Sequence, residues 1–424
     1  MRSLGLALLI PLVAAAPAAA TWSAPARVSP EGARAALPLA GFGTDGAAQV
    51  GWGGTQAGFA ADPFDAPRTT ALAHPSDAGA LDPRGGEWLA AAVARPGGDR
   101  IELVHVDRDA RVIERVLVSP RGVTARHPAL AVNARGDVLA AWEAIGRSGR
   151  RVIEAARRRH GGRWRVADVS RRGPAQSPAV ALDDSGAGIV AFRRGRYVRV
   201  AALSARGWGY PRAVGPAGPS GALTVSAAIA SSGAAAVIWA QHPATRSDPA
   251  MTSKVFVARR GPGTPFTDRQ TRILDLNGSP EAAGVAVAVG DDGATLAGWV
   301  GVTSFAPRVW VAYAPAGREW RLKVEAARAN ARRVAVAMAG GRAYVAWSGD
   351  ALGATDGAVG GPYAGPVIID CHTRLSLALA ADEHGAVLAY LRDSAGGSSD
   401  LDVARDLPGQ TPPDAPCPRA PAPH

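Results

Sequence analysis

A unit of about 48 residues recurs along the whole chain, and such a repeat limits the possible folds more than any other feature of a sequence. Its clearest copy runs from Pro128 to Trp142, where a turn containing Gly136 separates two apolar runs. Two degenerate copies contain Gly86 with Trp88 and Gly385 with Tyr390. In the six regular copies an aromatic residue lies six positions after a glycine, in the pairs Gly46/Trp52, Gly136/Trp142, Gly186/Phe192, Gly233/Trp239, Gly293/Trp299 and Gly341/Trp347.

Each unit predicts four short strands. Two strands flank the glycine turn, a Val-rich run such as 152–157 gives the third, and an aromatic-led run such as 164–170 gives the fourth. The first two are apolar on both faces, which suits sheets that are covered on both sides by neighbouring sheets. Four strands in such a period are typical of a β-propeller blade. We therefore predict an all-β propeller of four-stranded blades, with eight blades and seven as the alternative.

Two other interpretations of the unit are less favoured. Alanine favours helices, but short Val-Ala alternation between Gly and Asp turns favours strands. The turns at 183–186 and 291–293 resemble acidic metal loops, yet they lack the oxygen-ligand spacing of a calcium loop. Tight hairpin turns are the better interpretation of both segments.

The two ends of the repeat predict how the ring closes. Residues 22–29 match the fourth strand of the unit, and no first to third strands precede them. The last unit, 375–404, supplies three strands and no clear fourth. Pairing the N-terminal strand with this last unit would complete the blade and remove exposed sheet edges.

The first twenty residues predict export. Arg2, an apolar run and the Ala18-Ala19-Ala20 pattern have the order of a secretory signal peptide, cleaved after Ala20. We expect a secreted, extracellular protein with a signal peptide at 1–20, a propeller at 21–407 and a Pro-rich tail at 408–424. No later stretch offers the apolar length of a membrane span. Because an exported chain meets an oxidising compartment, its two cysteines, Cys371 and Cys417, are predicted to form a disulfide.

The repeat resembles that of secreted bacterial β-propeller proteins of the actinobacterial type, and more distantly that of sialidase-type propellers. The sialidase Asp-box reads Ser-x-Asp-x-Gly-x-Thr-Trp. The turn at 291–299 keeps Asp and Gly, but it lacks the leading Ser and places Trp299 too late. No Arg-Ile-Pro motif of the sialidase site is present. The resemblance therefore implies the fold and not the enzyme.

No catalytic, cofactor-binding or metal-binding motif stands out. The carboxylates form no recognisable pair for glycoside cleavage, and the eight histidines lack zinc spacing. No phosphate loop, dinucleotide fingerprint or nucleophile elbow occurs. Two function classes remain. The first is a non-catalytic binding or scaffolding module for a glycan, a cell-wall polymer or a protein, and the alternative is a degenerate sialidase-like glycoside hydrolase or lyase.

Any ligand is expected on the rim that carries the variable loops after the Trp positions, since binding usually resides in loops on a fixed scaffold. The net charge of +11 suits polyanions, but no basic stripe with interleaved aromatics supports nucleic acid. We expect a monomer. The candidate ligand-binding residues on these loops are Glu143, Arg193, Arg194, His242, Asp350 and Tyr363.

Overall fold

A computed structural model gives the architecture of the chain. It describes residues 22–30, 33–62, 64, 67–171, 173–217, 223–241, 253–278, 284–303, 306–321, 323–371, 373–393 and 399–406. The described chain is all β, apart from one short 3-10 helix, η1 (Asp268–Gln270). Within these segments no helix is long and apolar enough to cross a membrane.

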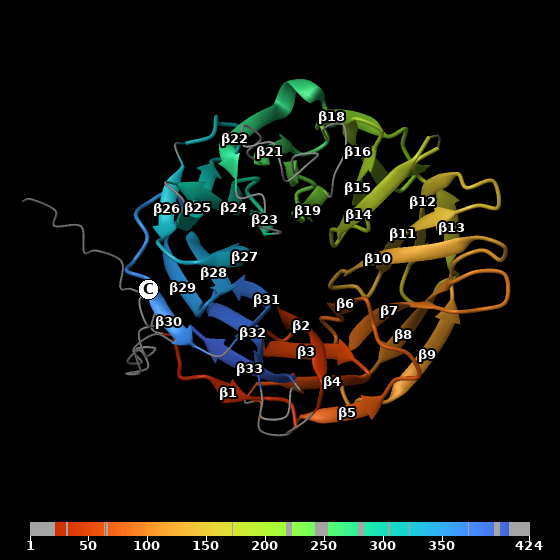
Figure 1. Ribbon diagram of the computed structural model, residues 1–424, viewed down its shortest axis with the longest axis horizontal. Helices are drawn as coiled ribbons and strands as arrows, with labels where there is room; N and C mark the ends of the chain where they lie inside the picture. Colours follow the sequence, from red (N-terminus) through yellow and green to blue (C-terminus); the bar gives the residue numbers. More distant parts are fainter. Residues whose placement is uncertain are drawn as a thin grey trace, which may run out of the picture.

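Eight four-stranded antiparallel blades surround a central axis, which confirms the predicted propeller and its blade number (Figure 1). The first and innermost strands of blades 1 to 8 are β2 (Ala35–Phe42), β6 (Ala78–Leu81), β10 (Thr124–Val132), β14 (Ala175–Leu182), β19 (Leu223–Ile229), β23 (Val285–Val289), β27 (Ala331–Ala339) and β31 (Thr373–Asp382). The second strands are β3 (Ala48–Gly54), β7 (Glu87–Val93), β11 (Val138–Ile145), β15 (Gly188–Arg194), β20 (Ala235–Gln241), β24 (Thr295–Thr303), β28 (Arg342–Gly349) and β32 (Gly385–Asp393).

The two outer layers follow the same order. The third strands are β4 (Gln56–Ala61), β8 (Arg100–Val106), β12 (Arg151–Arg158), β16 (Tyr197–Ser204), β21 (Ser253–Arg260), β25 (Ala306–Ala314), β29 (Leu352–Ala358) and β33 (Ser399–Arg405). The fourth strands are β5 (Arg68–Ala71), β9 (Val112–Leu117), β13 (Arg165–Asp168), β17 (Gly207–Trp208) with β18 (Arg212–Pro216), β22 (Thr271–Gly278), β26 (Val324–Ala327), β30 (Val367–Asp370) and β1 (Ala26–Arg27).

The ring closes as the sequence predicts. β1 pairs with β33, with Ala26 opposite Val403 and Arg27 opposite Asp402. An isolated bridge joins Trp22 to Asp406, and the Ser29 hydroxyl accepts a hydrogen bond from the Leu401 amide at 2.8 Å. The N-terminal strand is therefore the fourth strand of blade 8, and it covers the edge of β33 that would otherwise be open.

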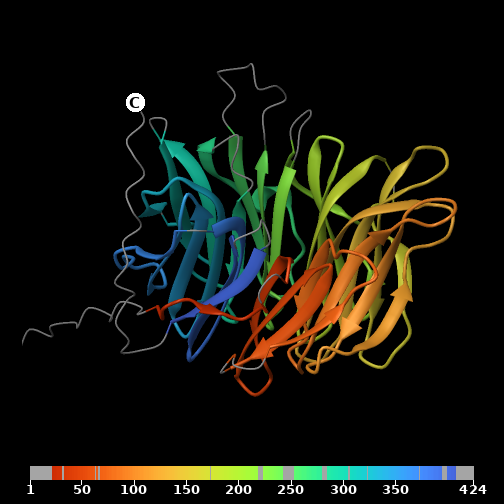
Figure 2. The same ribbon diagram turned by 60° about the horizontal axis from the view of Figure 1, so that its bottom comes forward.

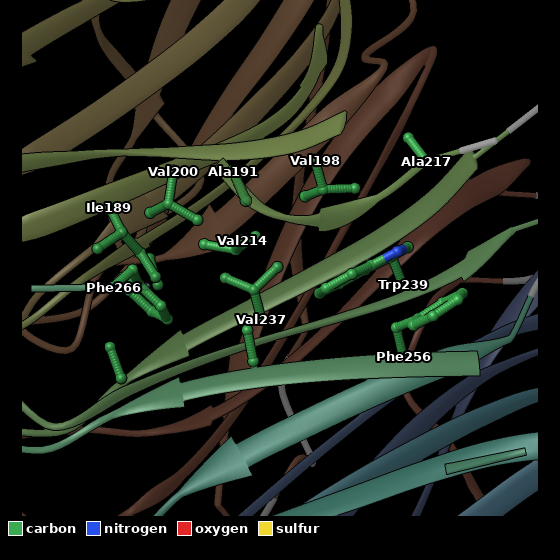
Figure 3. Packing of buried hydrophobic residues seen from close by; sticks show 13 residues of the cluster. Ile189, Ala191, Val198, Val200, Val214, Ala217, Val237, Trp239, Phe256 and Phe266 are labelled. Atoms are coloured by element: carbon green, nitrogen blue, oxygen red, sulfur yellow. The ribbon is translucent and has the colours of Figure 1, made fainter. Parts of the chain in front are cut away.

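The core lies between the blades. Each of eight clusters of buried apolar side chains fills one interface between neighbouring blades. In the cluster between blades 4 and 5, Trp239 of β20 stacks on Phe256 of β21 with ring centroids 5.4 Å apart (Figure 3). The aromatic residue that recurs six positions after the glycine is fully buried in every regular copy. This explains why the repeat keeps it, since an aromatic ring fills the wedge that opens between two blades.

The strand order defines two rims of the propeller, which the tilted view separates (Figure 2). The Gly-turn rim carries the turns between first and second strands and the connections between third and fourth strands. The post-Trp rim carries the connections between second and third strands and those between blades. This division locates every residue considered below.

Candidate functional site

The turns of the Gly-turn rim have two lengths. In blades 1 to 6, five residues separate the last paired residue of the first strand from the first paired residue of the second, as between Phe42 and Ala48. In blade 7 only Gly340 and Gly341 do so, and both have positive φ angles (56° and 76°), the backbone of a tight two-residue hairpin. Blade 8 also has a two-residue turn, 383–384. The turns of blades 7 and 8 therefore project less from the rim than the turns of the other six blades.

A cavity of about 1060 Å³ lies where the rim is low. It extends over the short turns of blades 7 and 8, and the long turns of blades 6 and 1 bound it on either side. We call it the mouth cavity, because it lies at the C-terminal ends of β23, β27, β31 and β2. These four strands are the innermost strands of their blades and lie around the ring axis (Figure 1). Its side chains with polar or aromatic chemistry are Phe42, Thr44, Asp45, Asp291, Asp292, Tyr313, Asp382, Glu383 and His384.

The aspartates of the mouth cavity use one carboxylate oxygen to hold the backbone. Asp292 accepts a hydrogen bond from the Ala294 amide at 2.8 Å, and Asp382 accepts from the amides of His384 and Gly385. These contacts are the turn chemistry that the sequence favours for Asp. Over the part of the chain that the structure describes, the second oxygen of each has no protein hydrogen bond. The turns thus present carboxylate oxygens to the cavity at fixed positions.

Aromatic and apolar side chains form the wall between blades 6 and 7. Tyr313 packs against the backbone of blade 7, since a Cβ on Gly360 would lie 2.6 Å from its ring. Burial and the neighbouring Asp292 raise the pKa of the Tyr313 hydroxyl, which therefore stays a neutral hydrogen-bond donor. The Arg321 guanidinium lies 6.0 Å from the centroid of the same ring. The cavity combines carboxylate acceptors with ring faces.

Three pairs of neighbouring turns elsewhere on this rim are linked by hydrogen bonds. The Thr44 amide donates to the Pro83 carbonyl at 2.8 Å between blades 1 and 2. The Ala134 amide donates to Asp184 at 2.8 Å between blades 3 and 4, and the Ser231 hydroxyl donates to Asp291 at 2.5 Å between blades 5 and 6. Among the described residues, the turns of blades 6, 7, 8 and 1 make no such link to one another. The cavity therefore occupies a stretch of four successive turns that are not bridged to one another.

Glu143 lies at the post-Trp end of its blade, but within strand β11 rather than in the predicted loop, and it supports the backbone there. The residue is 6% exposed, and its carboxylate accepts a hydrogen bond from the Ser177 amide at 2.8 Å. Ser177 has a positive φ of 57° at the start of blade 4, and its amide therefore needs a fixed partner. His127 lies 3.4 Å from the same carboxylate. Glu143 thus holds two adjacent blades together.

Three other candidates on this rim also contact the backbone or a neighbouring side chain. Arg193 donates to the Gly195 carbonyl at 3.0 Å, and Arg194 donates to the Ser170 carbonyl at 2.7 Å. The exposed Asp350 accepts from the Asn330 amide group at 2.6 Å. Within the described segments, none of these residues lines the mouth cavity or the two smaller hollows, of about 660 and 360 Å³. His242 lies outside the described residues.

The placement of Tyr363 on the post-Trp rim is wrong. The Gly-rich stretch 348–366 is not one loop, because β29 crosses the blade within it. Its small residues let the strand pack under Trp347, and Leu352 and Ala354 are fully buried. Tyr363 consequently lies in the connection from β29 to β30 on the Gly-turn rim, where burial raises the pKa of its hydroxyl well above the usual value.

Sequence reasoning missed the residues of the mouth cavity. The aspartates of the turns were interpreted as hairpin chemistry, and their backbone contacts confirm that part. The available signal was turn length, since the turns of blades 7 and 8 lack the five-residue pattern of their neighbours. In the described segments, no group of three or more His, Cys, Asp or Glu side chains is arranged to hold a metal ion.

Comparison with known proteins adds the following. No protein-family model matches the chain, and no curated protein sequence matches it. Among solved structures, the chain is similar to the polysaccharide lyase Uly1, with 8% identity, a TM-score of 0.48 and coverage of 91% of this chain and 99% of that one. An ulvan lyase from a new polysaccharide lyase family shows 11% identity, a TM-score of 0.45 and coverage of 76% and 90%. The Trypanosoma rangeli sialidase shows 11% identity, a TM-score of 0.37 and coverage of 76% and 60%.

Proposed function

We propose that this chain is an exported, non-catalytic binding propeller, and that its ligand is a neutral or amino-bearing glycan seated in the mouth cavity. The observation that carries the proposal is the cavity itself, whose volume of about 1060 Å³ suits a ligand of several sugar rings. It is the place where carboxylates from blades 1, 6 and 8 converge.

The chemistry of the lining selects among glycans. Carboxylate oxygens accept hydrogen bonds from sugar hydroxyls and form stronger, charge-assisted bonds with ammonium groups. The rings of Phe42 and Tyr313 offer apolar faces and, to an ammonium group, a cation–π contact. Asp45, Asp291 and Glu383 would repel a carboxylate or a sulfate at the same place. The mouth cavity therefore favours uncharged or cationic sugars over acidic ones.

Two features support binding without turnover. Glycoside hydrolysis needs two carboxyl groups that flank the scissile bond, one as acid and one as base or nucleophile. In the mouth cavity, Asp292 and Asp382 already hold the backbone of their turns. Glu143, the predicted acidic candidate on the other rim, is occupied by the Ser177 amide. A degenerate hydrolase or lyase is the alternative function, and it would release sugar.

Export is part of this proposal. Cleavage after Ala20 would leave one residue, Thr21, before Trp22, whose side chain is fully buried against blade 8. The ring closure begins at this residue, so the proposed mature chain keeps every residue that closes the ring. Cleavage after Ala20 is thus compatible with the ring closure.

The test is a glycan array with neutral, amino-bearing and acidic glycans, followed by calorimetry of the best ligand. Asp291→Asn combined with Asp382→Asn removes two charges, while the new amide oxygens can still accept the hydrogen bonds from Ser231 of blade 5 and from the blade 8 turn. We expect this pair to weaken binding about tenfold or more, because two charge-assisted contacts are lost. Asp184→Asn is the matched control, since Asp184 lies in a turn of the same rim outside the cavity.

Weaker binding of acidic glycans by the double variant than by the control, or equal affinity of the two for the best neutral or amino-bearing glycan, would contradict the proposed ligand and place. Turnover is measured separately, as release of reducing or unsaturated sugar ends from the bound glycan. Release well above the background of heat-denatured protein would replace the binding function by the enzymatic alternative.

A further inference from the structure

A second hollow of the Gly-turn rim has the opposite charge. It has a volume of about 360 Å³ and lies between the third-to-fourth-strand connections of blades 5 and 6. Five arginines line it, and the carboxylates of its lining are Glu319 and Asp292. Asp292 also lines the mouth cavity, so the two sites are neighbours. We call this hollow the basic groove, and its arginines are Arg259, Arg260, Arg269, Arg272 and Arg318.

The arginines of the basic groove are mostly not neutralised by the protein. Arg259 donates to the Pro315 carbonyl and Arg260 to the Thr264 carbonyl, both at 2.9 Å. Arg272 contacts Glu319 at 3.3 Å, in a pair whose two side chains are both exposed. Within the described segments, the other four make no ion pair. Carbonyl contacts orient a guanidinium group but leave its charge in place.

Blade 3 provides an internal comparison. Arg158 of β12 lies opposite Val138, the first residue after the blade 3 turn, and Arg260 of β21 lies opposite Ala235, the first residue after the blade 5 turn. The two arginines therefore occupy the same position of the blade. Arg158 donates to both oxygens of Glu114, at 2.7 Å and 2.5 Å. The carboxylate that neutralises Arg158 comes from β9 of the neighbouring blade 2, whereas Arg260 of blade 5 donates to a carbonyl of its own blade.

Burial makes incomplete neutralisation of these arginines costly. Partial burial lowers the pKa of the guanidinium groups of Arg259 and Arg260, and the nearby carboxylates of Glu319 and Asp183 offset this lowering only in part. A set of partly buried cations that outnumbers the nearby carboxylates gains free energy when an anion enters. The guanidinium fork matches phosphate and sulfate oxygens in a bidentate geometry.

The basic groove continues into a third hollow of about 660 Å³ between blades 4 and 5. Arg260 lines both hollows, and Arg199 and Arg212 add positive charge to the third, whose lining also contains the carboxylate of Asp268. A run of arginines across three blades fits an extended ligand with several anionic groups better than a single small ion. Tyr210, 63% exposed, is the one strongly exposed ring of the third hollow. A series of rings, as single-stranded nucleic acid uses for successive bases, is not part of either lining.

We propose that the basic groove binds an anionic polysaccharide through its sulfate or phosphate esters. This site is separate from the mouth cavity and does not depend on what the mouth binds. It explains why a chain with a net charge of +11 has an acidic mouth, since the positive charge serves a different ligand group on the same rim.

The test compares binding of dextran sulfate, phosphorylated dextran and unmodified dextran of equal length at 0.15 M salt. We expect the full chain to bind one or both esters and not unmodified dextran, and the tighter ester identifies the group. Arg269→Gln combined with Arg318→Gln should weaken binding about tenfold. Both residues are exposed, so the fold should not change. The matched control, Arg121→Gln with Arg332→Gln, removes two exposed charges from the other rim and should stay within about twofold.

Equal weakening by the two arginine pairs would overturn the proposal, because diffuse surface charge would then explain the binding. Absence of binding to both esters would overturn it as well. Tighter binding of an oligothymidylate than of either ester would assign the groove to nucleic acid instead. The Asp291→Asn, Asp382→Asn variant should bind the esters as the unmodified chain does, so failure of the mouth and failure of the groove are distinguishable.

Discussion

A very tight contact in the blades is that of a tryptophan against a glycine, and it predicts a specific sensitivity. Trp52 lies directly opposite Gly58 in the β3–β4 pair and is fully buried. A Cβ on Gly58 would overlap ring atoms Cζ2 and Cε2 of Trp52 and lie 2.5 Å from Cη2. The φ of Gly58 is not in the left-handed region, so the clash alone opposes alanine. Gly353 has the same relation to Trp347 in blade 7, with Cε2 at 2.6 Å.

The expected cost follows from the two ways of relieving the clash. Moving neighbouring side chains to accept an added group in a packed core costs about 1–3 kcal/mol. Moving the indole ring out of its site costs at most the packing of the whole tryptophan, about 3–5 kcal/mol. We therefore expect Gly58→Ala and Gly353→Ala each to lower the free energy of unfolding by about 3 kcal/mol. Gly365→Ala is the control, since nothing lies within 4 Å of its Cβ position.

The assay is urea unfolding followed by circular dichroism, with and without Trp52→Leu. Trp52→Leu alone should destabilise the chain, because it leaves a cavity. In its presence Gly58→Ala should cost at least about 1 kcal/mol less than it does alone, since the two residues are in contact and their effects are coupled. If the cost of Gly58→Ala is the same in both backgrounds, or if it matches that of Gly365→Ala, the packing argument is refuted.

Three further predictions concern the buried acid, the cysteines and the N-terminus. Burial raises the pKa of Glu87 well above its usual value, so the folded state keeps a proton that the unfolded state releases. The free energy of unfolding should therefore fall as the pH rises above about 4.3, the usual pKa of a glutamate. The slope is at most about 1.4 kcal/mol per pH unit. Glu87→Gln should flatten this dependence in urea unfolding at pH 5 and pH 8, and a parallel profile would contradict the assignment; the exposed Glu319→Gln is the control. Cys371 lies just after β30, and Cys417 lies outside the described residues. Their disulfide should stabilise the folded chain by up to about 4 kcal/mol. Peptide mass spectrometry of unreduced protein should find the cross-link rather than two alkylated cysteines. N-terminal sequencing of exported protein should begin at Thr21, and a chain that begins at Met1 would exclude cleavage.

The fold could be predicted in detail because its determinants are local and repeated. The glycine that opens each second strand and the aromatic six positions later mark one turn and one interblade wedge, and both occur in almost every unit. The ring closure could also be predicted, since Trp22 to Ser29 match a fourth strand that the last unit lacks. The place of Tyr363 was misinterpreted for a physical reason. The strand Leu352–Ala358, which precedes it, is rich in glycine and alanine because Trp347 covers it, and such a segment resembles a loop.

The mouth cavity could not be predicted because the repeated residues do not indicate the length of the turns that form it. In a five-residue turn the left-handed glycine is the fourth residue, as Gly136 is, whereas in blade 7 Gly341 is the second of two. The distance from this glycine to the buried tryptophan is six residues in both, so the signal that identifies the blade is unchanged when the turn before it shortens. Three residues fewer at one turn leave the core intact and open the rim. The proposed binding site on this scaffold therefore depends on turn length, which core packing does not constrain, whereas the repeated residues are those that the core requires.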